Sequence, residues 1–229
     1  MTGTVTELWR YPVKSMDGGR LDEAAVTPRG IPGDRAWALI DRATGKPLSG
    51  KRHAKLLLCR SRYLDEPTAK SVPPAEMTLP DGTVLSTDDP AAARVLSLYL
   101  GADCAPASSP GGFFDDRPLH LVTDASLRSL RAAFPLDFDR RRFRPNLLVS
   151  VAGDGFPELA WVGRTVAVGG ARIAVAKTTK RCVMTTLPQP GLPEERGVLP
   201  AVVKEGGALG VYGAVVADGV LRVGDLVSA

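Results

Sequence analysis

One segment combines a nucleophilic side chain with positive charge. Lys180 and Arg181 come directly before Cys182, just after a strand pattern. Positive charge stabilises a thiolate relative to a thiol, and a thiolate is both a nucleophile and a soft metal ligand. A cysteine in this setting can equally be a small buried apolar residue beside a solvated charged face. Taken alone, the segment favours neither interpretation.

Two other groups of cations lie where loops are expected. Lys14 and Ser15 follow the first strand pattern, and the four arginines of residues 140–144 precede a later one. An arginine binds phosphate or carboxylate through a fork of N–H groups, whereas a lysine acts as a point charge. Asp137 and Asp139 are close enough in sequence to pair with at least two of these arginines, which we expect to be ordinary surface residues.

A helix pattern begins at residue 124, directly after an apolar run. The free amide groups at a helix start can bind an anion, but the expected role of Thr123 or Asp124 is to cap the helix. His120 has no partner at the spacing of a metal site or a catalytic triad, so we interpret it as a structural residue.

Composition excludes several classes of protein. The 229 residues carry 29 basic and 25 acidic side chains, a net charge of +4, which is too small to indicate nucleic-acid binding. No apolar stretch is long enough to span a membrane, and residues 1–7 do not resemble a signal peptide. The three cysteines, Cys59, Cys104 and Cys182, form no disulfide or iron–sulfur pattern. We therefore expect a cytoplasmic protein without a nucleic-acid or membrane partner.

Short strand patterns separated by turn residues run through most of the chain. They predict a mainly β fold with a few helices (α+β), built from β-barrels and not from a βαβ sheet. The predicted strands cover residues 4–11, 35–41, 56–63, 77–79, 83–85, 146–151, 164–168, 172–176, 211–217 and 220–223, and the predicted helices cover residues 90–100 and 124–133. Asp81-Gly82 and Asp218-Gly219 are each predicted to connect a hairpin.

Loop residues separate two halves of the chain. Residues 108–112 read Ser-Ser-Pro-Gly-Gly, a run that favours turns over helix or strand. We predict an N-terminal β-barrel-like domain over residues 1–105 and a second β-barrel domain over residues 115–229.

Seven segments, in this order along the chain, resemble the MOSC family in its two-part form, which has an N-terminal MOSC-type β-barrel domain and includes the amidoxime-reducing components. They are residues 11–15 (Tyr-Pro-Val-Lys-Ser), 33–37 (Gly-Asp-Arg-Ala-Trp), 121–127 (Leu-Val-Thr-Asp-Ala-Ser-Leu), 143–146 (Phe-Arg-Pro-Asn), 181–186 (Arg-Cys-Val-Met-Thr-Thr), 209–212 (Leu-Gly-Val-Tyr) and 223–227 (Val-Gly-Asp-Leu-Val). The ordered set is more specific than any single segment.

The resemblance implies a molybdenum cofactor, in which molybdenum is bound to molybdopterin. Cys182 matches the cysteine expected to be the catalytic residue and the thiolate ligand of the metal. The positions that match cofactor-binding residues are Lys14, Ser15, Arg35, Thr123, Ser126, Arg144, Asn146, Arg181 and Tyr212. The charged side chains would neutralise the pterin's phosphate, and Ser15 and Asn146 would hydrogen-bond to the pterin or its tail.

The implied activity is the two-electron reduction of an N-hydroxylated or N-oxide small molecule, with electrons from a separate donor protein or reductase. Two alternatives remain open. One is a non-catalytic carrier of the cofactor or of a persulfide on Cys182, and the other is a structural or regulatory domain without cofactor. Residues 187–193 (Leu-Pro-Gln-Pro-Gly-Leu-Pro) differ from the animal reductases of the family, which affects the expected substrate pocket and partner surface.

Overall fold

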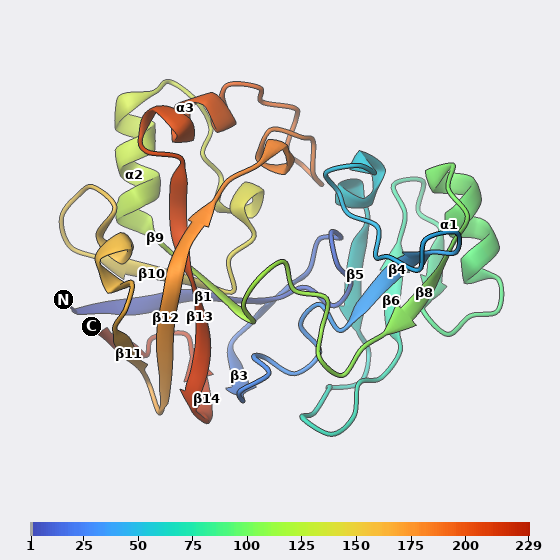
Figure 1. The fold of residues 1–229 in the computed structure, drawn as a ribbon, viewed down its shortest axis with the longest axis horizontal. Coiled ribbons are helices and arrows are strands. Elements are labelled where there is room, and N and C mark those ends of the chain that lie inside the picture. Colours follow the sequence, from blue (N-terminus) through green and yellow to red (C-terminus); the bar gives the residue numbers. More distant parts are fainter. Residues whose placement is uncertain (1) are drawn as a thin grey trace.

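A computed structural model describes residues 2–229 and shows two β regions joined side by side (Figure 1). The larger region is a closed barrel that contains both ends of the described chain. The smaller region carries the helix α1 (Ala92–Leu100) on its outer side. The fold is mainly β with a few helices, as the sequence predicted.

Seven strands close the barrel. Their order around the ring is β1 (Thr2–Arg10), β10 (Leu147–Val151), β9 (Leu119–Thr123), β13 (Ala208–Ala217), β12 (Ala171–Lys180), β11 (Thr165–Val168) and β15 (Leu226–Ser228). The strand β1 closes the ring because it pairs with β10 on one side and with β15 on the other. The barrel is therefore completed by a segment from the opposite end of the chain.

The inward face of β1 explains why this strand belongs to the barrel. Val5 and Leu8 are fully buried and pack in the barrel core with residues such as Val149 and Val227. A register shift between Val5 and Glu7 marks a bulge opposite β10. Burial of these side chains provides the hydrophobic contribution that holds β1 in the ring.

The smaller region consists of two small sheets around a second core. One sheet pairs β4 (Trp37–Asp41) with β8 (Cys104–Ser108), and the other has the order β5 (Arg60–Tyr63), β6 (Ala75–Thr78), β7 (Val84–Ser86). Their inner faces and α1 bury a common cluster that includes Leu39, Met77 and Leu96. The predicted hairpin at Asp81-Gly82 is confirmed, with Gly82 at a positive φ of 89°.

Two helices cover one end of the barrel in Figure 1, α2 (Asp124–Ala133) and α3 (Val198–Lys204). The predicted range of residues 124–133 is confirmed for α2, and Thr123 is its N-cap, because its Oγ1 accepts a hydrogen bond from the Ser126 amide. The predicted helix over residues 90–100 begins two residues later, at Ala92.

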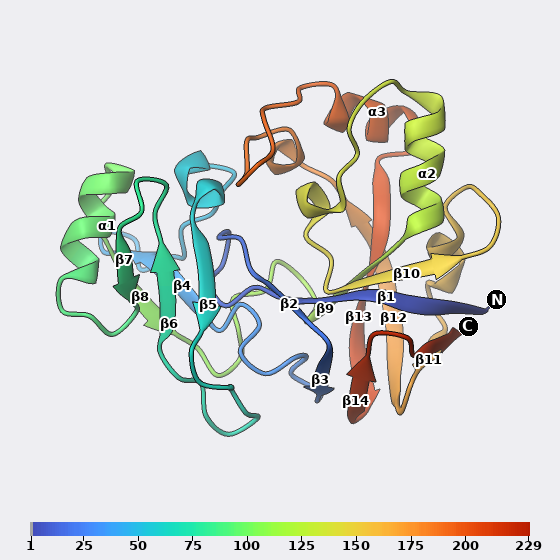
Figure 2. The same cartoon turned by 180° about the vertical axis from the view of Figure 1, so that it is seen from behind.

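Two strand predictions are wrong. Residues 211–217 and 220–223 do not form a hairpin with each other: β12 pairs with one edge of β13 as far as Ala217, β9 pairs with the other edge at residues 211–213, and residues 219–222 pair elsewhere. The strand β14 (Gly219–Arg222) turns away and pairs with β3 (Glu23–Val26), beside the short strand β2 (Gly19–Leu21) (Figure 2). Residues 56–63 are also not one strand, since Ala54–Leu58 forms a 3-10 helix that buries Leu56 and Leu57 before β5 begins.

The division into residues 1–105 and 115–229 stays a prediction. Within the described chain, no helix is both long enough and apolar enough to cross a membrane.

Candidate functional site

A cavity lies where the barrel meets the smaller region. It opens to solvent, and the space between its walls, counted together with the open solvent at its mouth, is about 730 Å³. Loops from distant parts of the chain form its wall: the loop after β1, the turn before β4, the segment after β8, the Arg140–Phe143 turn and the end of β12. The cavity therefore exists only because the two β regions are held together.

The cavity collects most of the residues that the sequence singled out. Lys14, Ser15, Arg35, Arg144, Asn146, Arg181, Cys182 and Tyr212 all line it. Thr123 and Ser126 do not line it; they lie buried beside Glu158, to which both hydroxyl groups donate hydrogen bonds.

Backbone strain is concentrated at this cavity. Among the described residues, the non-glycine residues with positive φ are Ser15 (67°), Arg35 (48°) and Arg144 (54°), and all three line the cavity. The left-handed conformation is unfavourable for residues with a Cβ, and it persists where the surrounding structure over-determines it. Such strain is common at functional sites.

Tyr11 supports two of the arginines. Its ring lies 4.6 Å from the Arg35 guanidinium carbon and 4.4 Å from that of Arg144, both within the range of cation–π contacts. Its hydroxyl donates to the Pro145 carbonyl at 3.1 Å. Burial raises the pKa of Tyr11 to about 12 despite the neighbouring arginines, so the ring stays neutral beneath two cations.

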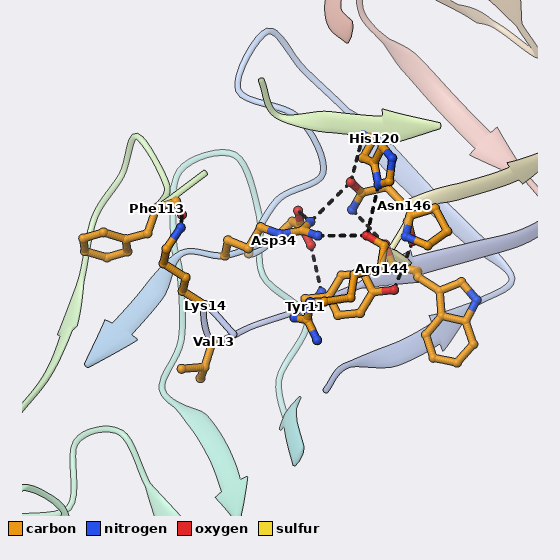
Figure 3. Close-up of polar contacts among 12 residues, drawn as sticks. Tyr11, Val13, Lys14, Asp34, Phe113, His120, Arg144 and Asn146 are labelled. Atoms are coloured by element: carbon orange, nitrogen blue, oxygen red, sulfur yellow. Dashed lines mark hydrogen bonds and ion pairs between the residues drawn. The ribbon is translucent and has the colours of Figure 1, made fainter. Parts of the chain in front are cut away.

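Asn146 links the arginines to the start of β9 (Figure 3). Its Oδ1 accepts from the His120 amide at 3.1 Å and from Arg35 Nη1 at 3.3 Å, and its Nδ2 donates to the Trp9 carbonyl at 3.1 Å. The amide oxygen thus accepts two hydrogen bonds, and through one of them it positions Arg35.

His120 connects two arginines. Arg181 Nη2 lies 2.6 Å from Nε2 of His120, and a guanidinium can only donate, so Nε2 accepts. The hydrogen then lies on Nδ1, which is 3.4 Å from the Arg144 carbonyl. Burial and the charge of Arg181 hold the pKa of His120 well below its ordinary value, which keeps the imidazole neutral.

Arg181 is held by backbone carbonyl groups. Its Nη1 donates to Phe143 O at 3.2 Å, and its Nη2 donates to Leu209 O. Its Nε is buried and has no hydrogen-bond partner among the described residues. Burial lowers the pKa of Arg181 to about 10, so the side chain stays charged at neutral pH.

Glu158 lies behind this contact and is fully buried. Its Oε1 accepts from the Gly210 amide at 3.1 Å, next to the Leu209 carbonyl that binds Arg181. Gly210 has a φ of 80°, and a Cβ there would lie 2.6 Å from the Leu121 carbonyl oxygen. Only glycine fits this turn without a shift.

Cys182 differs from the other two cysteines. It is half-buried and lines the cavity, whereas Cys59 and Cys104 are fully buried. Burial raises the pKa of the Cys59 thiol to about 11 and also raises that of Cys104, as expected for inert core residues. The Cys182 carbonyl caps the Val183–Thr185 turn by accepting from the Thr185 amide at 3.1 Å, which fixes the backbone at this cysteine.

Lys14 connects the cavity to the segment between the two β regions. Its Nζ donates to the Phe113 carbonyl at 2.8 Å and pairs with Asp115 (Figure 3 shows the Phe113 contact). The Phe113 amide in turn donates to the Arg35 carbonyl at 2.7 Å. This segment is therefore tied to the site residues that it covers.

Sequence reasoning missed several residues of this site. Tyr11 lies in a recognised segment, but nothing in the local pattern indicates that it carries two arginines. Glu158 could have been found from the sequence, because it is the single acidic residue among the apolar residues 156–161. A buried carboxylate needs hydrogen-bond donors around it. His120 has no such signal, because its partners lie far away in sequence.

The fold and site define a class of protein: two β regions that hold a cation-lined cavity beside a half-exposed free cysteine. Residues 108–228 match the MOSC domain, and residues 2–100 match the MOSC N-terminal beta barrel domain. The chain belongs to the MOSC domain family.

Curated relatives match nearly the whole chain at low identity. Mitochondrial amidoxime reducing component 2 of Bos taurus is 24% identical over 97% of this chain and 82% of its own length. Mitochondrial amidoxime-reducing component 1 of Mus musculus is 25% identical over 97% and 81%. Molybdenum cofactor sulfurase of Drosophila erecta is 28% identical over 78% of this chain but only 27% of its own length.

A solved structure shares the fold. The YUAD protein from Bacillus subtilis superposes with a TM-score of 0.54 at 16% identity, covering 99% of this chain and 94% of that one.

Proposed function

We propose that this protein is a molybdenum cofactor-dependent reductase of N-hydroxylated or N-oxide small molecules. The observation that carries this proposal is the convergence of Cys182 with Lys14, Arg35, Arg144 and Arg181 at one cavity. A soft sulfur ligand suits a sulfur-rich molybdenum centre, and a cluster of cations suits the phosphate of the pterin. The relatives named amidoxime reducing components support this choice of reaction.

The donor set fits the cofactor. The buried Nε of Arg181 has no hydrogen-bond acceptor within residues 2–229. Ser15 Oγ accepts from the Gly50 amide at 2.9 Å, so its own hydrogen is available to a ligand. Each of these two groups can donate a hydrogen bond to an acceptor such as a phosphate oxygen or a pterin heteroatom.

In this proposal the cofactor supplies two-electron redox chemistry at molybdenum, and the chain supplies its position. Cys182 Sγ would be the protein's ligand to the metal. Lys14, Ser15, Arg35 and Arg144 hold the phosphate end, with Tyr11 and Asn146 fixing the two arginines from behind.

Tyr212 is suited to hold a proton near Cys182. It lines the same cavity, and burial raises its pKa, so the phenol keeps its proton at neutral pH. It can donate a hydrogen bond to the oxygen of the substrate. The overall reaction consumes two electrons and two protons and converts an N-hydroxy compound into the amine or amidine and water.

We also propose that the electrons come from a separate donor protein. The sequence also led us to expect a separate donor protein or reductase. We propose that the substrate is a small molecule that enters the cavity beside Cys182. A second opening, whose lining includes Lys51, Lys177 and Lys180, also reaches Cys182 and Tyr212 and gives the substrate a route to Cys182.

The test compares wild type, Cys182→Ser and Cys104→Ala, all produced in a host that makes the cofactor. We expect stoichiometric molybdenum and pterin in wild type, together with reduction of benzamidoxime by a chemical electron donor. Cys182→Ser should lose turnover, and Cys104→Ala should keep it. Wild-type protein that contains neither molybdenum nor pterin would contradict the proposal.

The same samples test the alternative function. A carrier would show a persulfide on Cys182 without benzamidoxime turnover. The relative named molybdenum cofactor sulfurase is the reason to measure persulfide in parallel.

A further inference from the structure

Arg142 is a buried cation in the cavity wall that the cofactor assignment above does not use. Its side chain is only 2% exposed, and it lines the cavity. Its Nη2 donates to the Pro193 carbonyl at 3.0 Å. Its Nε and Nη1 have no acceptor anywhere in the described part of the chain.

The two neighbouring arginines each have a carboxylate partner, which Arg142 lacks among the described residues, although Nη1 of Arg140 is also buried without a hydrogen-bond partner there. Arg140 pairs with Glu7 and lies 3.8 Å from the centre of the Trp9 ring. Arg141 donates twice to Asp139, at 3.0 and 2.7 Å. Of the pairs expected with Asp137 and Asp139, the structure shows Arg141 with Asp139, whereas Arg140 pairs with Glu7, and both arginines are partly buried. Arg142 is buried in the protein.

An uncompensated buried guanidinium is expensive. Taking an ion out of water costs several kcal/mol unless an opposite charge or a full set of hydrogen bonds replaces the water. Within residues 2–229 no ion pair is formed by Arg142, and one carbonyl serves one of its three nitrogens. Arginine at position 142 is therefore favourable only if a bound molecule supplies hydrogen-bond acceptors for Nε and Nη1.

We propose that Arg142 is an oxyanion-binding residue of the cavity. It lies in the Arg140–Phe143 turn, on the wall that includes Cys182 and Thr185, whereas Lys14 and Ser15 come from the loop after β1. The ligand is an anionic oxygen, either of the cofactor's phosphate or of a substrate that carries phosphate or carboxylate. The inference rests on the proposed function only in taking this cavity as a ligand site.

The test uses Arg142→Met in the cofactor-free protein, because methionine keeps much of the volume without charge. Thermal unfolding is measured over a series of inorganic phosphate concentrations. Without phosphate, we expect the midpoint of Arg142→Met to equal or exceed that of wild type, since an unpaired buried charge has been removed. With phosphate, we expect the apparent affinity taken from the midpoint increase to fall about tenfold.

Arg141→Met is the matched control. Arg141 is the next residue in the same turn and is paired with Asp139, so its loss should leave the phosphate affinity unchanged. If Arg142→Met does not fold, Arg142→Lys is measured in the same way, with the same expected loss of affinity. Full retention of the wild-type phosphate effect in the Arg142 variant would overturn the inference, whatever happens to the stability without phosphate.

The cofactor-loaded protein distinguishes the two sources of the oxyanion. If the cofactor's phosphate occupies Arg142, added phosphate no longer raises the midpoint of loaded wild type. If the site serves the substrate, the phosphate effect persists after loading and phosphate competes with carboxylated substrates. The apo experiment needs neither molybdenum nor turnover, so failure of the proposed reductase function would not be mistaken for failure of this inference.

Discussion

Glu158 and Arg181 bind opposite ends of the same peptide group. The Gly210 amide donates to Glu158 Oε1 at 3.1 Å, and the Leu209 carbonyl of that peptide accepts from Arg181 Nη2. The cation beside Cys182 thus depends on a carboxylate that does not line the cavity.

Glu158→Ala should destabilise the fold strongly. The change leaves the hydroxyl groups of Thr123 and Ser126 and the Gly210 amide without their buried acceptor. We expect the free energy of unfolding to fall by about 3 kcal/mol, measured by urea denaturation. Glu158→Gln keeps one acceptor oxygen and should lose less. Glu194, which is exposed and pairs with Arg196, provides the control; a Glu158→Ala variant as stable as Glu194→Gln would contradict this reading.

Gly210→Ala should displace the turn that holds Arg181. A Cβ at this position would lie 2.6 Å from Leu121 O and 2.7 Å from His120 Nε2, so the backbone must move. Gly207→Ala isolates conformational strain, because Gly207 also has a positive φ, of 77°, but its Cβ would meet no atom within 4 Å. We expect a loss of about 1 kcal/mol for Gly207→Ala and clearly more for Gly210→Ala. Equal losses in urea denaturation would show that the close approach does not matter.

Stability should depend on pH through His120. Burial and Arg181 lower its pKa in the folded state, so below about pH 6.5 the unfolded chain binds the extra proton. This contribution to stability is complete above that pH and is lost as the pH falls, by up to about 1.4 kcal/mol per pH unit.

The measurement is the free energy of unfolding of cofactor-free protein at about pH 7.5 and about pH 5.5, for wild type and His120→Gln. The loss between the two pH values should be larger in wild type, because glutamine does not titrate. Identical losses would exclude His120 as the group responsible.

A fragment of residues 115–229 should not fold alone, because it lacks β1 and leaves β10 and β15 unpaired on one side. Thr2 pairs with Ser228 in antiparallel register, so a short linker from residue 228 to residue 2 can restore the strand. We expect that residues 115–228, followed by such a linker and residues 2–10, regain dispersed NMR signals that the fragment lacks. A well-folded fragment without β1 would support residues 115–229 as an independent domain.

Local pattern was sufficient for much of the fold. The Asp81-Gly82 hairpin and the helix after Thr123 follow from turn and capping chemistry, which acts within a few residues. The hairpin expected at Asp218-Gly219 did not form for a reason outside its own residues: β14 pairs with β3, from the N-terminal part of the chain, while β12 takes one edge of β13 as far as Ala217. Strand pairing is decided by competition over the whole chain, which a local turn signal does not report.

The site shows the same limit. The cations and Cys182 could be named from motifs, and they meet at one cavity. The partner of Thr123 and Ser126 could not, because Glu158 reaches them from 35 and 32 residues away. The orientation of the Arg140–Phe143 turn also could not be predicted from the sequence. This orientation determines that Arg141 pairs with Asp139, whereas Arg142 is buried without an ion pair among the described residues.

The closure of the barrel by β1 also sets an order of events during synthesis. The strand β1 can pair with β2 soon after it is made, but its two barrel partners, β10 and β15, are made much later, and β15 is the last of the barrel strands along the chain. Until β10 and β15 have been made, the apolar side chains of Val5 and Leu8 must be covered by another surface, either that of the smaller region or that of a chaperone. The cavity wall spans a similar interval, from Lys14 to Tyr212, so the cavity is complete only once Tyr212 has been made.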